Sequence, residues 1–541
     1  MQPRDYQTDC LTKTTKMLSG EDMRVLAVLA TGLGKTIIFA MLAEIWHREN
    51  RGRVLVICPN IELVKQAADK IFQVTGRSPA IEQASNWSNE CVDNEDYRSD
   101  FVVSCKASLV SAMPDGRKRY ERFKDIGLVV VDEAHLAATS QYTAILDHFD
   151  CPTLGVTATP KRHDKVALRD IFDKCSYNYG IREAINDGWL VGCQTHCLQL
   201  QSLNLSQVST ANGDFVASQL GHVMEEDEVV FEVAEAVFNE SGNDKTIVFT
   251  ASVNQAEKVA SVLCDVYGMK ADFVCGDKAR CSDDRRQDVL DSFRGDKAGI
   301  QVVCNVGVLS IGFDCPTLTH ILLARPTKSL TWFTQCFGRG TRALEGVVDF
   351  QGSTPELRKQ AISLSEKPFF RFTDLRDVSL KHKLITPIDV LGGKHSVAEQ
   401  TIAKKLLEAS DVHRDVNEVL EEAERLAREE EENLRRREAA SRKAVEEALE
   451  RLRLSRIHAR SRFTKIAVDP FMAGLPAVTH EVTAHARSQG PIIMFGKYKS
   501  QPIATLPLGY LRYMNEKYGF HDARTRQAVH DRLGITSQGA T

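Results

Sequence analysis

A short glycine-containing loop between two apolar runs constrains this chain more than any other stretch of its sequence. The loop 30–36, ATGLGKT, follows the apolar run 25–29 and leads into the amphipathic run 37–43. This order predicts a strand, a tight turn and a helix, and the backbone N–H groups of such a turn point at a phosphate. Lys35 then supplies a positive charge for the β- and γ-phosphates, and the Thr36 hydroxyl is a magnesium ligand.

An alternative stays open when this loop is considered alone. The general phosphate-loop pattern has a glycine where this chain has Leu29, and a Gly-Leu-Gly turn can join a core strand to a core helix by chance. The strand-loop-helix context favours nucleotide binding. The rest of the chain decides between the two interpretations.

The size and composition of the chain indicate a globular protein of several domains. Its 541 residues are too many for one hydrophobic core, so we expect three or four domains. Hydrophobic residues make up 43% of it and charged residues 26%, as in soluble proteins. No apolar run reaches the roughly 18 residues of a membrane span, and no secretory signal is visible. We therefore expect a cytoplasmic protein with no membrane partner.

The cysteines bear on whether the chain has a metal site, and the net charge bears on how it could bind a nucleic acid. Most of the 14 cysteines stand singly in apolar runs, no CxxC pair occurs, and Cys193 and Cys197 have no second pair at zinc-site spacing. We therefore expect no structural metal. The net charge of −4 gives no overall basic footprint, so any nucleic-acid binding needs a local groove.

Two acidic residues follow a buried strand in the first part of the chain. The runs 54–58 and 128–131 are continuously apolar, as in strands buried on both faces of a parallel sheet. The tetrapeptide 132–135, DEAH, follows the second run. In one sheet with a phosphate loop, Asp132 would hold magnesium and Glu133 would orient or deprotonate the attacking water. The alternative, a solvated acidic turn, fits poorly behind a wholly apolar strand.

Strands and helices alternate through this first part, which predicts a doubly wound α/β domain. Further strands are expected at 101–104 and 154–156. Upstream of the phosphate loop, the stretch 3–7 (PRDYQ) ends in an amide that can pair with adenine, donating and accepting at once. The alternative at Gln7 is an ordinary helix start, and the chemistry of the residue alone does not decide.

A second α/β series follows and ends in two arginines. Its strands are expected at 246–250 and 300–304, with helices between them. Arg339 and Arg342 lie in the stretch 335–342, QCFGRGTR. If they face a γ-phosphate across a cleft, such arginines act as arginine fingers, which raise the rate of hydrolysis by roughly 10³–10⁵. The alternative is a solvated basic turn.

Taken in order, these motifs resemble those of the superfamily 2 DEAD/DEAH-box helicases, in the bacterial and phage group similar to XPB and restriction-subunit motors. The resemblance covers about residues 2–390. PRDYQ resembles the Q motif, ATGLGKT resembles motif I with a leucine at 29 that is normal in this family, and DEAH resembles motif II. The stretches CPNIELVKQ, TATP, 246–257, 305–314 and QCFGRGTR resemble motifs Ia, III, IV, V and VI.

The resemblance implies a fold and a domain order. It implies an α/β protein with two tandem RecA-like doubly wound parallel-sheet domains, then a long helical segment and a small C-terminal α+β module. We place the first domain at 1–190, the second at 191–392, the charged helical segment at 393–465 and the small module at 466–541. The stretch 381–384, KHKL, also fits the way this group ends its second domain.

The resemblance also implies ATP and Mg²⁺ as cofactors and assigns residue roles. The ATP-binding residues are Arg4, Gln7, Thr31, Gly32, Leu33, Gly34, Lys35, Thr36, Gly312 and Asp314. The catalytic residues are Lys35, Glu133, Gln335, Arg339 and Arg342, and the magnesium ligands are Thr36 and Asp132. His135, Thr157 and Thr159 couple hydrolysis to domain motion. Ile311 departs from the acidic residue often found before the motif V glycine.

The implied mechanism is an ATP-driven clamp that advances along a nucleic acid, with DNA favoured over RNA as the partner. ATP closes the cleft between the two domains, and hydrolysis releases the closure. Candidate contacts to the nucleic-acid backbone are Pro59, Lys106, Ser108, Thr250 and Asn305. Alternatives are a nucleotide-switched DNA- or RNA-binding clamp and a motor subunit of a restriction or defence complex.

The last third of the chain predicts a helix and a small module. From about 412 to 460, apolar residues recur at helical spacing in a segment rich in Glu, Arg, Ala and Leu. We expect a long helix or helical hairpin that lies on the motor or on a partner protein, and the alternative is a solvated free helix. The stretch 495–499, FGKYK, resembles a small bacterial and phage module with a glycine where this chain has Ser500. Its lysines and tyrosines would contact nucleic acid or form a small core.

Overall fold

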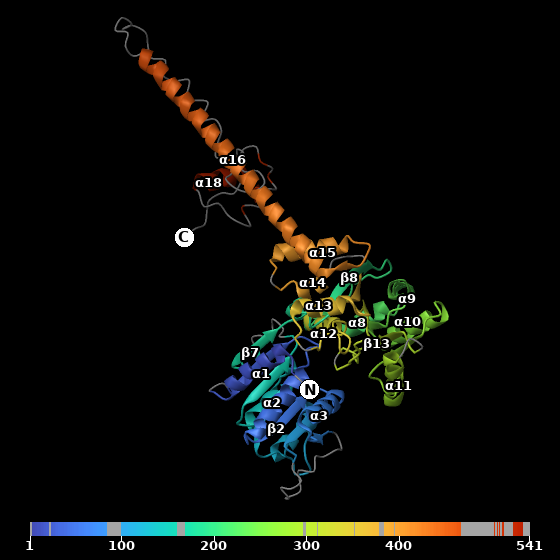
Figure 1. Cartoon of the computed structure of the whole chain (residues 1–541). Coiled ribbons are helices and arrows are strands. Elements are labelled where there is room, and N and C mark those ends of the chain that lie inside the picture. Colours follow the sequence, from blue (N-terminus) through green and yellow to red (C-terminus); the bar gives the residue numbers. More distant parts are fainter. Residues whose placement is uncertain are drawn as a thin grey trace. The chain divides into compact units, whose positions relative to one another are not determined.

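The computed structural model (Figure 1) describes most of the chain. The described residues are 3–20, 23–83, 99–159, 168–295, 299–310, 312–350, 352–377, 384–393, 395–466 (side chains to 455), Ile503, Leu506, Leu508, Leu511, Arg512, Asn515 and 523–533. The chain forms two compact units, 1–435 and 436–541. Ile311, the stretch 381–383 and the FGKYK stretch lie outside the described residues. Within the described part of the chain, no helix combines the length and apolarity needed to cross a membrane.

The first part of the larger unit is a parallel sheet of seven strands in the order β3-β4-β2-β5-β6-β1-β7. Its strands are β1 (Arg24–Leu29), β2 (Arg53–Cys58), β3 (Ala80–Glu82), β4 (Phe101–Cys105), β5 (Ile126–Asp132), β6 (Thr153–Thr157) and β7 (Lys174–Tyr179). The helical elements around it are α1 (Asp5–Leu18), α2 (Lys35–Arg48), α3 (Ile61–Thr75), α4 (Lys106–Leu109), η3 (Arg119–Arg122), η4 (Ala134–Leu136), α5 (Ser140–His148) and α7 (Ile181–Asn186).

Both faces of this first sheet are buried, because successive side chains of a strand point to opposite faces. In β2, Val54 and Val56 join the core on the side of α2 and α3, whereas Leu55 and Ile57 join the core on the side of α5. Figure 1 shows α1, α2 and α3 packed together on this domain. The continuous apolar runs of the sequence are therefore strands covered on both sides, as in other parallel sheets.

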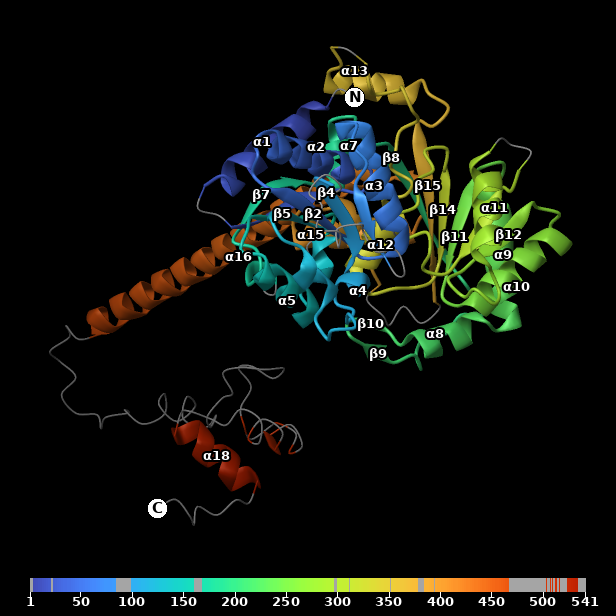
Figure 2. The same cartoon turned by 90° about the horizontal axis from the view of Figure 1, so that it is seen from below.

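A second sheet of seven strands has the order β12-β13-β11-β14-β15-β8-β16. Its strands are β8 (Gly192–Gln199), β11 (Thr246–Thr250), β12 (Ala271–Val274), β13 (Val302–Asn305), β14 (His320–Ala324), β15 (Phe369–Arg376) and the short antiparallel edge strand β16 (Arg414–Asp415). The helices are α8 (Ala217–Met224), α9 (Asp227–Ser241), α10 (Val253–Asp265), α11 (Asp283–Arg294), α12 (Leu330–Phe337), α13 (Pro355–Ser363), α14 (Pro387–Leu391) and α15 (Val397–Glu408). A hairpin of β9 (Thr210–Ala211) and β10 (Asp214–Phe215) precedes α8. Figure 2 shows α9, α10 and α11 beside β11 and β12.

The predicted architecture of two doubly wound parallel-sheet domains followed by a helical segment is confirmed. The segment is the helix α16 (Val416–Ile466), which has 51 residues. Its first turns bury Val416, Val419, Leu420 and Ala423, and its side chains from 428 to 455 are exposed. Among the described residues after it, α18 (Ala523–Leu533) supplies Val529 to a small apolar cluster with Ile503, Leu506 and Leu511.

Candidate functional site: a nucleotide site between two domains

The phosphate loop joins the end of β1 to Lys35, the first residue of α2. Gly32 and Gly34 adopt φ angles of +90° and +69°, which L side chains rarely adopt. A Cβ atom on Gly34 would also lie 2.8 Å from Nε2 of Gln7. The loop and the N-terminus of α2 thus form a backbone concavity suited to a phosphate. Leu29 is a fully buried residue of β1, so the leucine there belongs to the core and not to the loop.

The two acidic residues lie at the carboxyl end of β5, between the strands that carry the phosphate loop and motif Ia. Asp132 is the last residue of β5, and its Oδ1 accepts a hydrogen bond of 2.9 Å from the Glu133 N–H. Glu133 adopts a left-handed φ of +50° and is 8% exposed, and Asp132 is 6% exposed. A strained, non-glycine backbone at this edge holds both carboxylates where they can serve one site.

The electrostatics of the two acids differ. Burial, and next the neighbouring Glu133 charge, raise the pKa of Asp132 above its ordinary value. Burial also acts to raise the pKa of Glu133, but the positive charge of Lys35 and the contact with His135 outweigh it and leave this pKa lowered. The positive charge of Lys35 opposes the rise in the pKa of Asp132 without cancelling it, and a divalent cation would add positive charge there.

His135 connects the acidic motif to the threonines of motif III. Its Nδ1 lies 3.3 Å from Glu133 Oε2 and 3.1 Å from Thr157 Oγ1. The Thr159 N–H donates to the same Thr157 hydroxyl over 3.3 Å. The three residues that the sequence assigns to coupling thus lie in one chain of contacts that starts at Glu133.

Arg339 is held in the second domain by the loop that follows β13. Its Nη1 donates to Phe313 O over 2.7 Å, and its Nη2 and Nε donate to Ser310 O over 2.7 and 3.2 Å. Burial lowers its pKa to about 10, while the negative charge of Glu133 in the other domain acts in the opposite direction. Arg342 pairs with Asp314, and the predicted site residue Gln335 is buried on α12.

The two domains touch at the phosphate loop. A Cβ atom on Gly32 would lie 3.1 Å from Cγ of Arg342, and one on Gly338 would lie 2.6 Å from Cβ of Thr31. Beside this contact, Gln66 on α3 donates a hydrogen bond of 2.7 Å to Gly312 O. The structure therefore brings the predicted phosphate loop, motif V and motif VI residues together.

The N-terminal residues also reach the phosphate loop. The Tyr6 hydroxyl and Gln7 Nε2 donate to Leu33 O over 2.9 and 3.2 Å, and Gln7 Oε1 accepts from the Arg4 N–H over 3.0 Å. One amide N–H and one lone pair of Gln7 remain for a base. The Arg4 guanidinium instead forms a two-point ion pair with Asp349, at 2.7 and 2.9 Å. Sequence reasoning missed this pair, because Asp349 lies in no motif.

A hollow with a volume of about 940 Å³ lies between the two domains. Its lining residues include Pro59, Asn60, Ser108, Arg119, Gly276, Lys278, Arg286 and Val306. Of the predicted nucleic-acid contacts, Pro59 and Ser108 line it, and Lys106 lies with its Nζ 5.7 Å from the Tyr142 ring centre. The basic side chains of Arg119, Lys278 and Arg286 were not found from the sequence, which places them in no motif.

Two other predicted contacts use their side chains inside the second domain. Thr250 Oγ1 donates to Asn305 O over 2.9 Å. Asn305 Nδ2 donates to Val248 O over 3.3 Å, and its Oδ1 accepts from the Leu309 N–H over 3.2 Å. Both residues are buried, so in this structure they support the motif V loop from behind.

Comparison with known proteins agrees with the arrangement of the motifs. Residues 1–162 match the family model of the type III restriction enzyme res subunit, and residues 229–344 match that of the helicase conserved C-terminal domain. The Saccharomyces cerevisiae protein named as the ATP-dependent helicase IRC3 is 26% identical over 424 residues, which cover 74% of this chain and 58% of that protein. The endonuclease subunit of the type I restriction enzyme EcoAI of Escherichia coli is 28% identical over 395 residues, covering 65% of this chain and 46% of that protein.

Solved structures show the same fold. A fragment of an HsdR subunit of a type I restriction enzyme from Vibrio vulnificus superposes with a TM-score of 0.50 and 20% identity, covering 69% of this chain and 64% of that one. The chain spans 46–58% of the length of the two curated relatives above. It matches the two halves of a helicase core in order, and it belongs to the superfamily 2 DEAD/DEAH-box helicases, in the group that contains restriction-enzyme subunits.

Proposed function

We propose that this protein is an ATP-dependent helicase or translocase that moves along DNA, driven by hydrolysis of MgATP between its two RecA-like domains. The observation that carries the proposal is the contact between the phosphate loop and motif VI, where Gly338 meets Thr31 and Arg342 meets Gly32. A γ-phosphate in the loop would have Lys35 on one side and the two arginines on the other. This is the arrangement that in-line phosphoryl transfer requires.

The residues of the first domain fit a nucleotide with its metal ion. The backbone of residues 31–34 and the Lys35 amine would bind the phosphates, and Gln7 would bind the base through its remaining N–H and lone pair. Thr36 and Asp132 would hold Mg²⁺, which neutralises phosphate charge. The position of Asp132 supports this assignment, because its carboxylate is buried at the carboxyl end of β5 and Lys35 offsets only part of the rise in its pKa.

Glu133 is the residue that we assign to the attacking water. Its lowered pKa keeps the carboxylate ionised, so it can accept a proton or orient the water by a hydrogen bond. His135 shares its Nδ1 between Glu133 and Thr157. A change at the carboxylate can thus reach motif III, which is the coupling role proposed for His135, Thr157 and Thr159.

The hollow lined by Pro59, Ser108 and Lys278 is the proposed track for the nucleic acid. It lies between motif Ia on one domain and the loops after β12 and β13 on the other, so motion of one domain against the other would change its width. Lys278 and Arg286, which both pair with Asp283 in this structure, would meet backbone phosphates, and this predicts binding that weakens with salt. DNA is favoured over RNA because restriction-enzyme subunits are among the relatives.

The test separates a motor from a nucleotide-controlled clamp. The purified chain is given ATP and a triplex-forming oligonucleotide on duplex DNA, and in parallel a partial duplex with a single-stranded tail. Displacement of either strand that requires hydrolysable ATP supports the motor. Nucleotide-dependent DNA binding without displacement of either strand would contradict it and support the clamp.

A second candidate is a motor subunit of a restriction or defence complex. The matches to the res subunit and to the EcoAI endonuclease subunit favour it. The exposed part of α16 offers a surface for such a protein partner. Co-purification of the tagged chain with a defined set of methyltransferase or nuclease subunits would support this candidate, and a monomer with full ATP-driven strand displacement would argue against it.

A further inference from the structure

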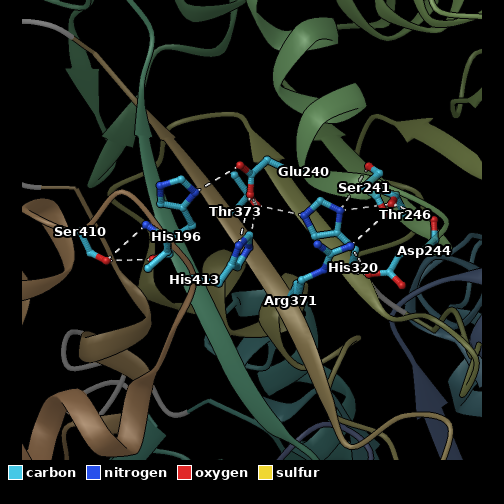
Figure 3. A network of polar contacts seen from close by, with 11 residues as sticks. His196, Glu240, Ser241, Asp244, Thr246, His320, Arg371, Thr373, Ser410 and His413 are labelled. Atoms are coloured by element: carbon cyan, nitrogen blue, oxygen red, sulfur yellow. Dashed lines mark hydrogen bonds and ion pairs between the residues drawn. The ribbon is translucent and has the colours of Figure 1, made fainter.

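A cluster of two histidines and one glutamate lies in the second domain, on segments that no motif includes. Figure 3 shows the rings of His196 and His413 turned toward the carboxylate of Glu240. His196 belongs to β8, Glu240 to the last turn of α9, and His413 to the segment between α15 and α16. The side chain of His196 is 8% exposed, that of His413 is 15% exposed and that of Glu240 is 14% exposed. The cluster is therefore largely buried.

The three side chains stand at distances that suit one metal ion. His196 Nδ1 lies 3.2 Å from Glu240 Oε1, and His413 Nδ1 lies 3.3 Å from Glu240 Oε2. One ligand atom from each residue lies within 4.8 Å of the other two. Ligands bound at about 2.0–2.1 Å to a tetrahedral zinc ion stand roughly 3.3 Å apart. The two histidine–glutamate distances already match this separation, and the third pair of ligand atoms lies within 4.8 Å.

The hydrogen bonds around the cluster point to a cation between His413 and Glu240. The Thr373 hydroxyl has a single proton, and it donates to Glu240 Oε2 over 3.4 Å. Thr373 Oγ1 must then accept from His413 Nε2, 3.4 Å away, and from His320 Nε2, 3.0 Å away. With its proton on Nε2, a neutral His413 presents a lone pair on Nδ1 to the carboxylate. His413 Nδ1 and Glu240 Oε2 are then two hydrogen-bond acceptors 3.3 Å apart, and a positive charge between them would relieve their repulsion.

The contact between His413 Nε2 and Thr373 Oγ1 also suits a metal ligand. A hydrogen bond from the outer ring nitrogen is the contact that fixes the tautomer of a metal-binding histidine.

We propose that His196, Glu240 and His413 bind one divalent transition-metal ion, with Zn²⁺ as the preferred ion. Two imidazole nitrogens and a carboxylate oxygen form a ligand set that zinc accepts, and a water molecule completes the coordination. The ion has a structural role. It joins β8 and α9 of the second domain to the segment that leads into α16, where β16 adds only two residues to the sheet edge. The inference does not depend on the proposed ATPase.

The test uses the full-length chain, freed of metal with a chelator, and Zn²⁺ alone in competition with a chromogenic zinc ligand. The wild-type chain is expected to bind one Zn²⁺ ion. His413→Gln and Glu240→Gln are each expected to lower the affinity for this ion by at least about tenfold. The matched control is His395→Gln, which removes a similar histidine–carboxylate contact, 3.0 Å from His395 Nδ1 to Glu399 Oε2. The control is expected to bind Zn²⁺ like the wild type.

A second measurement keeps the test valid if a variant fails to fold. In the wild-type chain, Zn²⁺ is expected to raise the midpoint of thermal unfolding and to slow amide hydrogen exchange at 411–420 relative to the metal-free chain. Zinc binding that is equal in the wild type and both cluster variants would overturn the proposal. Zinc that leaves the unfolding midpoint and the exchange of 411–420 unchanged in the wild type would overturn it as well.

Discussion

Gly338 of the second domain lies directly against Thr31 of the phosphate loop, so that a Cβ atom on the glycine would stand 2.6 Å from the threonine Cβ. The glycine has φ −63° and ψ −13°, which any L residue adopts. Its lack of a side chain therefore serves the approach of the two domains and not the local backbone. The distance defines how closely motif VI can approach a bound phosphate.

Gly338→Ala is expected to slow ATP hydrolysis by roughly 100-fold, because the added methyl group would hold the arginines about 1 Å too far from the phosphates. The fold and the affinity of the first domain for nucleotide should change little. Gly393→Ala is the matched control, since nothing lies within 4 Å of a Cβ atom built there. Equal turnover rates for the two variants would mean that the domains do not close at Gly338 during hydrolysis.

The two arginines are expected to differ in what their removal does to stability. Arg339→Ala and Arg342→Ala should each lower kcat by about 10³ or more, with nucleotide affinity largely retained. Arg339→Ala should also destabilise the second domain by roughly 1–3 kcal/mol, because it removes both side-chain donors of the Ser310 carbonyl and leaves the Phe313 carbonyl only the 3.4 Å hydrogen bond from Arg342. Thermal unfolding and single-turnover hydrolysis measure the two effects. A loss of nucleotide binding in Arg339→Ala would show that the residue is structural.

Gln7 is expected to determine the preference for adenine. In Gln7→Glu, one oxygen can still accept from the Arg4 N–H, but the second oxygen would face Leu33 O and cannot donate to a base. The KM for ATP should rise by about tenfold or more, while the KM for GTP should change less. Steady-state kinetics with both nucleotides check this. A parallel rise in both KM values would indicate damage to the phosphate loop and no role in base recognition.

Lys367 is expected to make stability depend on pH. Its buried amine donates to Pro316 O and Arg342 O over 2.9 and 2.8 Å, and burial lowers its pKa from 10.5 to about 7. Between these two pKa values the unfolded chain binds the proton that the folded chain lacks. This group therefore makes stability rise as pH increases from about 7 to about 10, and the contribution is constant below that range.

Urea unfolding of the wild type and Lys367→Met at both ends of this pH range tests the effect. When the pH is raised, the free energy of unfolding of the wild type should increase by about 1–3 kcal/mol more than that of the variant. The variant should be less stable at each pH, because two buried carbonyls lose their donor. Parallel pH profiles for the two proteins would show that the amine keeps an ordinary pKa.

The features that sequence could predict are those encoded by neighbouring residues. The glycines at 32 and 34 and the apolar run before Asp132 each specify their local conformation, and parallel strands then bring their carboxyl ends to one edge. The DEAH acids, the phosphate loop and the two arginines could therefore be placed from motif order alone. The confirmed family assignment rests on the same local patterns.

The features that sequence could not predict join distant segments. Arg4 and Asp349 are 345 residues apart, and Asp349 belongs to no motif. Thr250 and Asn305 end strands that are buried on both faces, so no polar alternation indicates the direction of their side chains. The expectation of no structural metal came from cysteine spacing, whereas the proposed metal ligands are two histidines and a glutamate on three separate segments.

The central claim is that binding of a nucleic acid stimulates ATP hydrolysis between the two domains. Steady-state ATPase activity tests it most directly. The rate is measured with no nucleic acid, with single-stranded DNA, with duplex DNA and with RNA, for the wild type and for Lys35→Ala. We predict strong stimulation by DNA in the wild type and no turnover in Lys35→Ala under any condition. Turnover that no polymer stimulates, or that survives in Lys35→Ala, would contradict the account.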